Sequence, residues 1–195
     1  MQLDLPELRR RLARRSQPEF TVFGDDGTEG REFANTAAAV LIPVIAHREL
    51  TVLFTQRTTE LKSHAGQVSF PGGRAEPEDA SAEFTALREA EEEIGLSAGR
   101  VEILARLPDY RTRTGFRVTP VIGLVTPPLE LAPDPREVEE VFEVPLEFLL
   151  DAGNRQRRTR EFQGKTVGYY VFEYQDRVIW GATAGMLVNL YRMLE

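Results

Sequence analysis

Residues 67–96 read QVSFPGGRAEPEDASAEFTALREAEEEIGL, and this stretch decides the fold of the chain. It predicts a short strand, a glycine turn, a loop and a helix. The helix is expected to end at Gly95, because a left-handed glycine followed by an apolar residue is typical of a Schellman-type end. At its start, Asp79 is a suitable N-cap. Both ends of the predicted helix are therefore marked in the sequence.

The predicted helix carries apolar and acidic side chains on different sides. At about 100° per residue, four apolar residues fall within roughly 120° of one another and are predicted to pack inward. They are Phe84, Leu87, Ala90 and Ile94. Three glutamates cluster on nearly the opposite side: Glu89, Glu92 and Glu93. We therefore expect one side of the helix to be buried and the other to collect negative charge.

The spacing of these glutamates, i, i+3 and i+4, is unfavourable without a counter-charge. Each like-charged pair costs an isolated helix roughly 0.2–0.5 kcal/mol, and negative charge in the last turns opposes the helix dipole. A hard cation such as Mg²⁺, which takes oxygen ligands, would reverse this cost. The alternative is a solvated acidic face, the usual role of a charge run. Local conflicts of this kind tend to fall at functional sites.

Residues 88–96, REAEEEIGL, resemble the end of the Nudix box, R-E-U-x-E-E-x-G-U with U aliphatic or small, and Gly73 resembles its opening glycine. The front half departs from the pattern G-x5-E-x7-R. Asp79 stands in place of the glutamate, and the loop before Arg88 is one residue longer.

Two upstream segments narrow the resemblance. LFTQR at 53–57 and HAGQVSFPGG at 64–73 are similar to the extra motif of the coenzyme A diphosphatase branch, which tolerates the longer loop. The resemblance implies an α/β/α sandwich with a mixed sheet between helices. It also implies hydrolysis of coenzyme A at its diphosphate, giving 4′-phosphopantetheine and 3′,5′-ADP.

Breaking a phosphoanhydride requires charge neutralisation and a nucleophile near neutral pH, which bound divalent metals supply. We expect Mg²⁺ or Mn²⁺ as cofactor, held by Glu89 and Glu93 with Glu92 as a further ligand. These glutamates are also the expected catalytic residues, with Glu89 preferred as proton acceptor. Arg88 is within i+4 reach of Glu92 and is expected to orient a carboxylate.

Further residues are expected around this centre. Six candidates for substrate binding lie in or beside the extra motif: Arg57, His64, Ser69, Gly72, Gly73 and Arg74. An additional carboxylate, implied by the resemblance, is Glu137 or Glu140. The basic aromatic loop 109–115 either holds a nucleotide or is a plain hairpin tip.

The remaining pattern predicts strands and a few helices. Apolar or β-rich runs indicate strands at 37–46, 51–55, 101–107, 118–125, 137–144 and within 160–174. Helical patterns occupy 3–15, 146–150 and 181–194, and 126–136 is a proline-rich connection.

Bulk composition sets limits on the class of protein. The 195 residues fit one domain over 1–195, with 1–36 as an N-terminal helix and loop extension. There is no cysteine, which excludes disulfides and thiolate metal sites. A net charge of −7 disfavours nucleic acid as partner, and no run predicts a membrane span. We expect a cytoplasmic monomer or homodimer acting on a small-molecule substrate.

Two other functions fit the same residues. One is hydrolysis of another nucleoside-diphosphate-linked substrate, such as an ADP-sugar or a dinucleotide. The other is a Nudix-like module that binds a nucleotide without cleaving it. The set Arg88, Glu89, Glu92 and Glu93 argues against the second, because a binding module has no need of a full hydrolytic ligand set.

Overall fold

A computed structural model describes residues 3–14, 36–60, 64–162 and 164–195. The predicted N-terminal loop lies almost wholly outside these residues. At the centre is β1 (Thr36–Ile45), formed by the apolar run that the sequence predicts. It pairs in parallel along its whole length with β7 (Phe116–Val125), which in turn pairs antiparallel with β5 (Val101–Arg106) and the short β6 (Tyr110–Arg111).

The other edge of β1 is divided between two partners. Its end pairs with β2 (Thr51–Arg57) across a hairpin, while its start pairs with β4 (Gly72–Arg74). Outward from β2 lie β8 (Val138–Pro145) and β3 (Val68–Ser69), both antiparallel to it. The parallel pairing of β1 with β7 makes the main sheet mixed, as predicted. Gly72 and Gly73, predicted to form a turn after a strand, instead begin the short strand β4.

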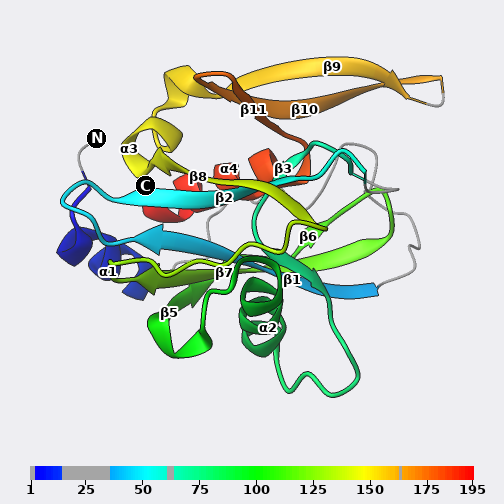
Figure 1. Cartoon of the computed structure of the whole chain (residues 1–195). Coiled ribbons are helices and arrows are strands. Elements are labelled where there is room, and N and C mark those ends of the chain that lie inside the picture. Colours follow the sequence, from blue (N-terminus) through cyan, green and yellow to red (C-terminus); the bar gives the residue numbers. More distant parts are fainter. Residues whose placement is uncertain (1–2, 15–35, 61–63, 163) are drawn as a thin grey trace.

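Helices cover both faces of this sheet, which confirms the predicted α/β/α sandwich (Figure 1). Helix α2 (Ala82–Ile94) packs on the face that receives Leu41 of β1. Helices α1 (Leu5–Ala13) and α4 (Ala182–Leu194) pack on the face that receives Ile42. Successive strand residues point to opposite faces, so a strand buried on both faces is apolar throughout.

A second, antiparallel sheet of three strands precedes the last helix. Its strands are β9 (Gln156–Phe162), β10 (Lys165–Tyr174) and β11 (Arg177–Trp180), in the order β11-β10-β9. Two short helical elements, α3 (Leu146–Leu149) and the 3₁₀ turn Ala152–Asn154, connect β8 to it. Another 3₁₀ turn, Ala98–Arg100, precedes β5. In the described part of the chain, no helix is both long and apolar enough to cross a membrane.

Two expectations for α2 are wrong. Its N-cap is Ser81, whose side chain accepts a hydrogen bond from the Phe84 N–H, and Asp79 lies before it. Phe84 is 52% exposed. The side that meets the sheet carries Ala86 in addition to the predicted Ala90 and Ile94, and the two small side chains allow the helix to approach β1 closely.

Candidate functional site

Gly72 must be glycine because the backbone of β1 approaches it too closely for any Cβ, whereas at Gly73 the end of a side chain occupies the place of a Cβ. A Cβ on Gly72 would lie 2.4 Å from the carbonyl oxygen of Ala39. A Cβ on Gly73 would lie 2.6 Å from the carboxyl carbon of Glu89. Backbone pairing of Gly72 and Gly73 with Val40 and Ala39 holds β4 against β1, and the missing Cβ of Gly73 leaves room for the Glu89 carboxylate on the turn. The two glycines therefore build the site by lacking side chains.

Glu93 is the most buried of the three predicted ligands, at 5% exposure. Its Oε2 accepts a hydrogen bond of 3.2 Å from the Gly72 N–H, and Nη1 of Arg57 lies 3.5 Å from its Oε1. Burial raises the pKa of Glu93 to about 7, and the charge of Glu89 adds to this. The Gly72 hydrogen bond and Arg57 act in the opposite direction without cancelling the shift. Glu93 therefore lies at the edge of the buried side of α2, and not on its solvent-exposed side.

Glu89 is half-buried beside it, and Glu92 is exposed. Burial also raises the pKa of Glu89, against the lowering effect of Arg88. The side chain of Glu92 is 60% exposed and pairs with Arg88 at 3.1 Å. The three predicted ligands are therefore unequal, since two are partly or fully withdrawn from water and one is on the rim.

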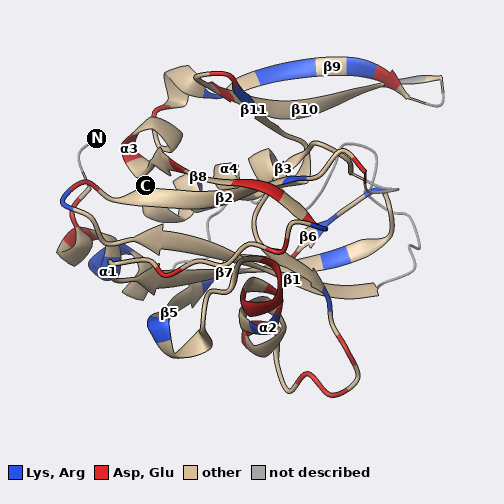
Figure 2. Ribbon diagram, viewed as in Figure 1, with Lys and Arg blue, Asp and Glu red and all other residues tan. Residues whose placement is uncertain are grey.

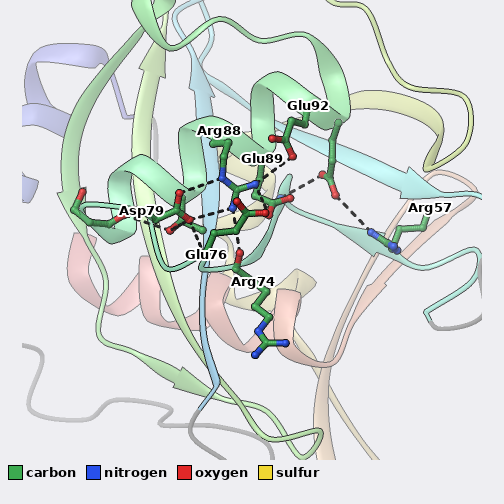
Figure 3. A network of polar contacts seen from close by, with 11 residues as sticks. Arg57, Arg74, Glu76, Asp79, Arg88, Glu89 and Glu92 are labelled. Carbon is green, nitrogen blue, oxygen red and sulfur yellow. Dashed lines mark hydrogen bonds and ion pairs between the residues drawn. The ribbon is translucent and has the colours of Figure 1, made fainter.

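Arg88 links these glutamates to the loop before the helix (Figure 3). Its Nη1 lies 3.0 Å from Glu89 and 3.1 Å from Glu92, while its Nη2 donates to Asp79 and to the carbonyl of Arg74. The Arg88 guanidinium holds the pKa of Asp79 well below its usual range. The predicted contact of Arg88 with Glu92 is present. The sequence did not predict the Asp79 contact, although Asp79 stands where the Nudix box places a glutamate.

Of the two candidates for an additional carboxylate, Glu137 lies nearer the centre. Its charge raises the pKa of both Glu89 and Glu93. Glu140 points elsewhere, because it pairs with Arg177 of β11.

The C-terminal end of α2 is tied down by the proline-rich connection. Gly95 is left-handed at φ 69°, and the N–H groups of Gly95 and Leu96 close a Schellman-type end, as predicted. The N–H groups of Ala132 and Asp134 donate to the carbonyls of Ile94 and Glu93, both at 2.9 Å. Partnering these carbonyls reduces the exposed negative end of the helix next to the glutamates.

A cavity of about 460 Å³ opens beside the glycine turn. Four of the six predicted substrate-binding residues line it: Arg57, His64, Ser69 and Gly72. The other two do not, since Gly73 packs against Glu89 and the exposed Arg74 side chain points away from the cluster (Figure 3). Because Arg57 and Gly72 also contact Glu93, the cavity and the carboxylates are neighbours.

The far wall of this cavity comes from segments distant in sequence. Arg113, between β6 and β7, belongs to the basic aromatic loop that was predicted either to bind or to be a hairpin tip. The second sheet contributes four residues that the sequence analysis did not single out: Arg160, Phe162, Tyr169 and Trp180. The signal for Arg160, Phe162 and Tyr169 was the richness of 160–174 in aromatic and β-branched residues, which does not reveal the face of the sheet on which each side chain lies, and Trp180 lies outside that stretch.

Comparison with known proteins places this geometry in a family. Residues 35–163 match the NUDIX domain model. The chain belongs to the Nudix family. It is 41% identical over 161 residues to the uncharacterized Nudix hydrolase NudL of Photorhabdus laumondii, covering 83% of this chain and 86% of that protein. NudL of Yersinia pestis is 40% identical over 161 residues, covering 83% and 81%.

Among solved structures, a Caenorhabditis elegans Ap4A hydrolase in a binary complex is similar with a TM-score of 0.49 and 18% identity. The match covers 56% of this chain and 80% of that one. The Nudix hydrolase RenU of Mycobacterium smegmatis gives a TM-score of 0.49 at 21% identity, over 60% of this chain and 81% of its own.

Nudix hydrolases generally use divalent metal ions, typically Mg²⁺ or Mn²⁺, and the donor set of this Nudix site suits them. The charge of Glu137 raises the pKa of both Glu89 and Glu93, and the charge of Glu89 adds to the rise at Glu93, which is a deficit of positive charge that a hard cation relieves. Within the described residues, no three such side chains converge on one point. Arg88 lies between Glu89 and Glu92 and competes with a cation for them.

Proposed function

We propose that this Nudix hydrolase cleaves the diphosphate of coenzyme A to 4′-phosphopantetheine and 3′,5′-ADP. The observation that carries the proposal is the position of the 64–73 segment, whose sequence resembles the coenzyme A diphosphatase motif. It forms one wall of the cavity and, through Gly72, contacts Glu93. A diphosphate at this junction would reach the carboxylates while the rest of the substrate occupies the cavity.

Glu89 and Glu93 would hold the cations, with Glu92 and Glu137 as further oxygen donors at the rim. When bound, these ions supply charge neutralisation on phosphate oxygens and a nucleophilic water near neutral pH. Burial raises the pKa of Glu89, and a carboxylate with a raised pKa is a stronger acceptor for the proton of the attacking water.

Arg57 and Arg88 have separate tasks in this proposal. Arg57 lines the cavity and lies 3.5 Å from Glu93, so its guanidinium can contact a phosphate oxygen without leaving the carboxylate. Arg88 is 17% exposed and contacts Asp79, Glu89 and the Arg74 carbonyl, so it fixes the carboxylates in place. We assign Arg88 to positioning and Arg57 to substrate.

The test is mass spectrometry of the products from coenzyme A hydrolysed in ¹⁸O-labelled water with Mg²⁺ or Mn²⁺, with ADP-ribose assayed in parallel. We expect coenzyme A to be the better substrate, with the label on a single product phosphate. Turnover of ADP-ribose with none of coenzyme A would replace this proposal by the wider nucleoside-diphosphate class. Turnover of neither, with retained binding, would indicate the non-catalytic module.

A further inference from the structure

The cavity has a second region of positive charge, on the wall away from the acidic helix. Arg113 lies over the Phe162 ring at 4.9 Å, and Arg160 lies 5.5–5.7 Å from the rings of Phe162, Tyr169 and Trp180. Figure 2 shows the two charge regions, acidic on α2 and basic along β9. One cavity thus adjoins carboxylates at one end and carries arginines at the other.

Arg160 differs from many other arginines of this chain in what it contacts. Arg158, two residues earlier on β9, pairs with Glu173 at 2.6 Å, and Arg177 pairs with Glu140. Within the described residues, Arg160 contacts three aromatic rings and no carboxylate. Stacking on rings fixes a guanidinium without neutralising it. Its charge therefore remains available for an anion.

The rings add a second kind of recognition at the same wall. Phe162 is 39% exposed, and Tyr169 and Trp180 are partly exposed, all three lining the cavity. Partly exposed aromatic faces next to guanidinium groups suit a planar base attached to a phosphate, since the ring stacks and the phosphate takes charge-assisted hydrogen bonds. An uncharged substrate tail would leave these arginines unused.

We propose that Arg113 and Arg160 bind a phosphate monoester on the nucleoside of the substrate, separate from the diphosphate that is cleaved, with Trp180 and Tyr169 beside the base. The inference rests on the proposed function for the position of the scissile diphosphate. It makes this wall a determinant of specificity, selecting nucleotides with an extra phosphate. In coenzyme A that group is the 3′-phosphate of the adenosine.

The experiment compares kcat/KM for coenzyme A and for dephospho-coenzyme A, which lacks that phosphate. In the wild type we expect coenzyme A to be preferred. Arg160→Gln should reduce the ratio of the two kcat/KM values by about tenfold or more, corresponding to the loss of one charge-assisted hydrogen bond. Arg113→Gln should act in the same direction. An unchanged ratio in both variants would overturn the proposal.

Arg158→Gln is the matched control. It removes the same charge from the same strand, but its side chain pairs with Glu173 and does not line the cavity. The ratio should stay at the wild-type value. If Arg158→Gln lowers the ratio as much as Arg160→Gln does, general attraction of anions explains the preference, and the site is not at Arg160.

A binding measurement separates this inference from the proposed function. Calorimetry without divalent ions compares adenosine 3′,5′-bisphosphate with adenosine 5′-monophosphate, so hydrolysis plays no part. We expect the bisphosphate to bind more tightly to the wild type and to lose that advantage in Arg160→Gln. An enzyme that fails to cleave coenzyme A but shows this difference would refute the proposed substrate alone. Equal binding of both nucleotides would refute the arginine site alone.

Discussion

A carboxylate almost completely withdrawn from solvent lies at each end of α2, and the two differ in how fully hydrogen bonds and positive charge compensate them. Before the helix, the Asp79 side chain is 2% exposed and receives hydrogen bonds from Arg88, Thr85 and the Glu76 N–H. Near its end, the Glu93 side chain is 6% exposed and has the Gly72 N–H and, at 3.5 Å, Arg57.

The difference appears in the pKa shifts. Arg88 holds the pKa of Asp79 far below its usual range, whereas burial raises that of Glu93 to about 7. A buried charge that is fully compensated is tolerated by the fold, and removing one partner of the pair destabilises it. One that is under-compensated costs stability, and it is retained where a missing counter-charge is supplied by a ligand. The contrast supports the proposal that the cation binds at the C-terminal end of α2.

The most severe test of this contrast is Glu93→Gln. We expect kcat to fall by at least about 10³-fold, because the substitution removes a negatively charged oxygen donor from the centre. Stabilisation by Mn²⁺ in thermal unfolding should decrease as well, while the metal-free variant should unfold at no lower temperature than the wild type. Glu91→Gln, an exposed position on the same helix, is the control. Near-normal turnover in Glu93→Gln would contradict the proposal that the C-terminal end of α2 binds the cation.

Gly73→Ala sharpens the contrast by displacing a carboxylate without changing any charge. Because its Cβ would meet the Glu89 carboxylate at 2.6 Å, we expect Glu89 to shift and kcat/KM to fall by about 10²-fold. The assay is steady-state hydrolysis with a titration of Mn²⁺, which should also show weaker activation. Gly99→Ala has open space around its Cβ and should keep full activity. Equal activity of the two variants would mean that the position of Glu89 is unimportant.

Asp79→Asn tests the opposite end and should have the smallest effect on catalysis. At pH 7 we expect a lower unfolding temperature, since the pair with Arg88 is lost. A carboxyl whose folded pKa is depressed contributes stability above its unfolded pKa of about 3.9, and this is lost as the pH falls toward the folded value. The gap between variant and wild type should therefore narrow below about pH 4. Glu78→Gln, exposed next door, should show no gap at any pH.

Local signals in the sequence were sufficient for much of the fold. The apolar run of β1 and the Gly95-Leu96 helix end depend on neighbouring residues only, and both are where the sequence placed them. The same holds for the i+4 pair of Arg88 and Glu92. Phe84 was misplaced because helical periodicity alone does not show how close the helix comes to the sheet.

Long-range contacts account for what the sequence did not show. Asp79 meets Arg88 nine positions later only because the loop folds back over the first turns of α2. Arg160 and Trp180 reach the cavity because the second sheet lies opposite the glycine turn, and the pairing of β9 with β10 fixes which side chains share a face. No local sequence pattern predicts either arrangement.

The attachment of the proline-rich connection to the end of α2 has a consequence for engineering. A Cβ on Gly95 would lie 2.8 Å from the Ala132 backbone nitrogen, so the end of the helix and the connection pack closely against each other. Glu137 follows directly, its N–H bonded to the Asp134 carbonyl at 3.0 Å. Anyone recombining this scaffold with a homologue should therefore exchange residues 82–138 as a block, because a crossover inside it would part the connection from the Ile94 and Glu93 carbonyls that its N–H groups bind.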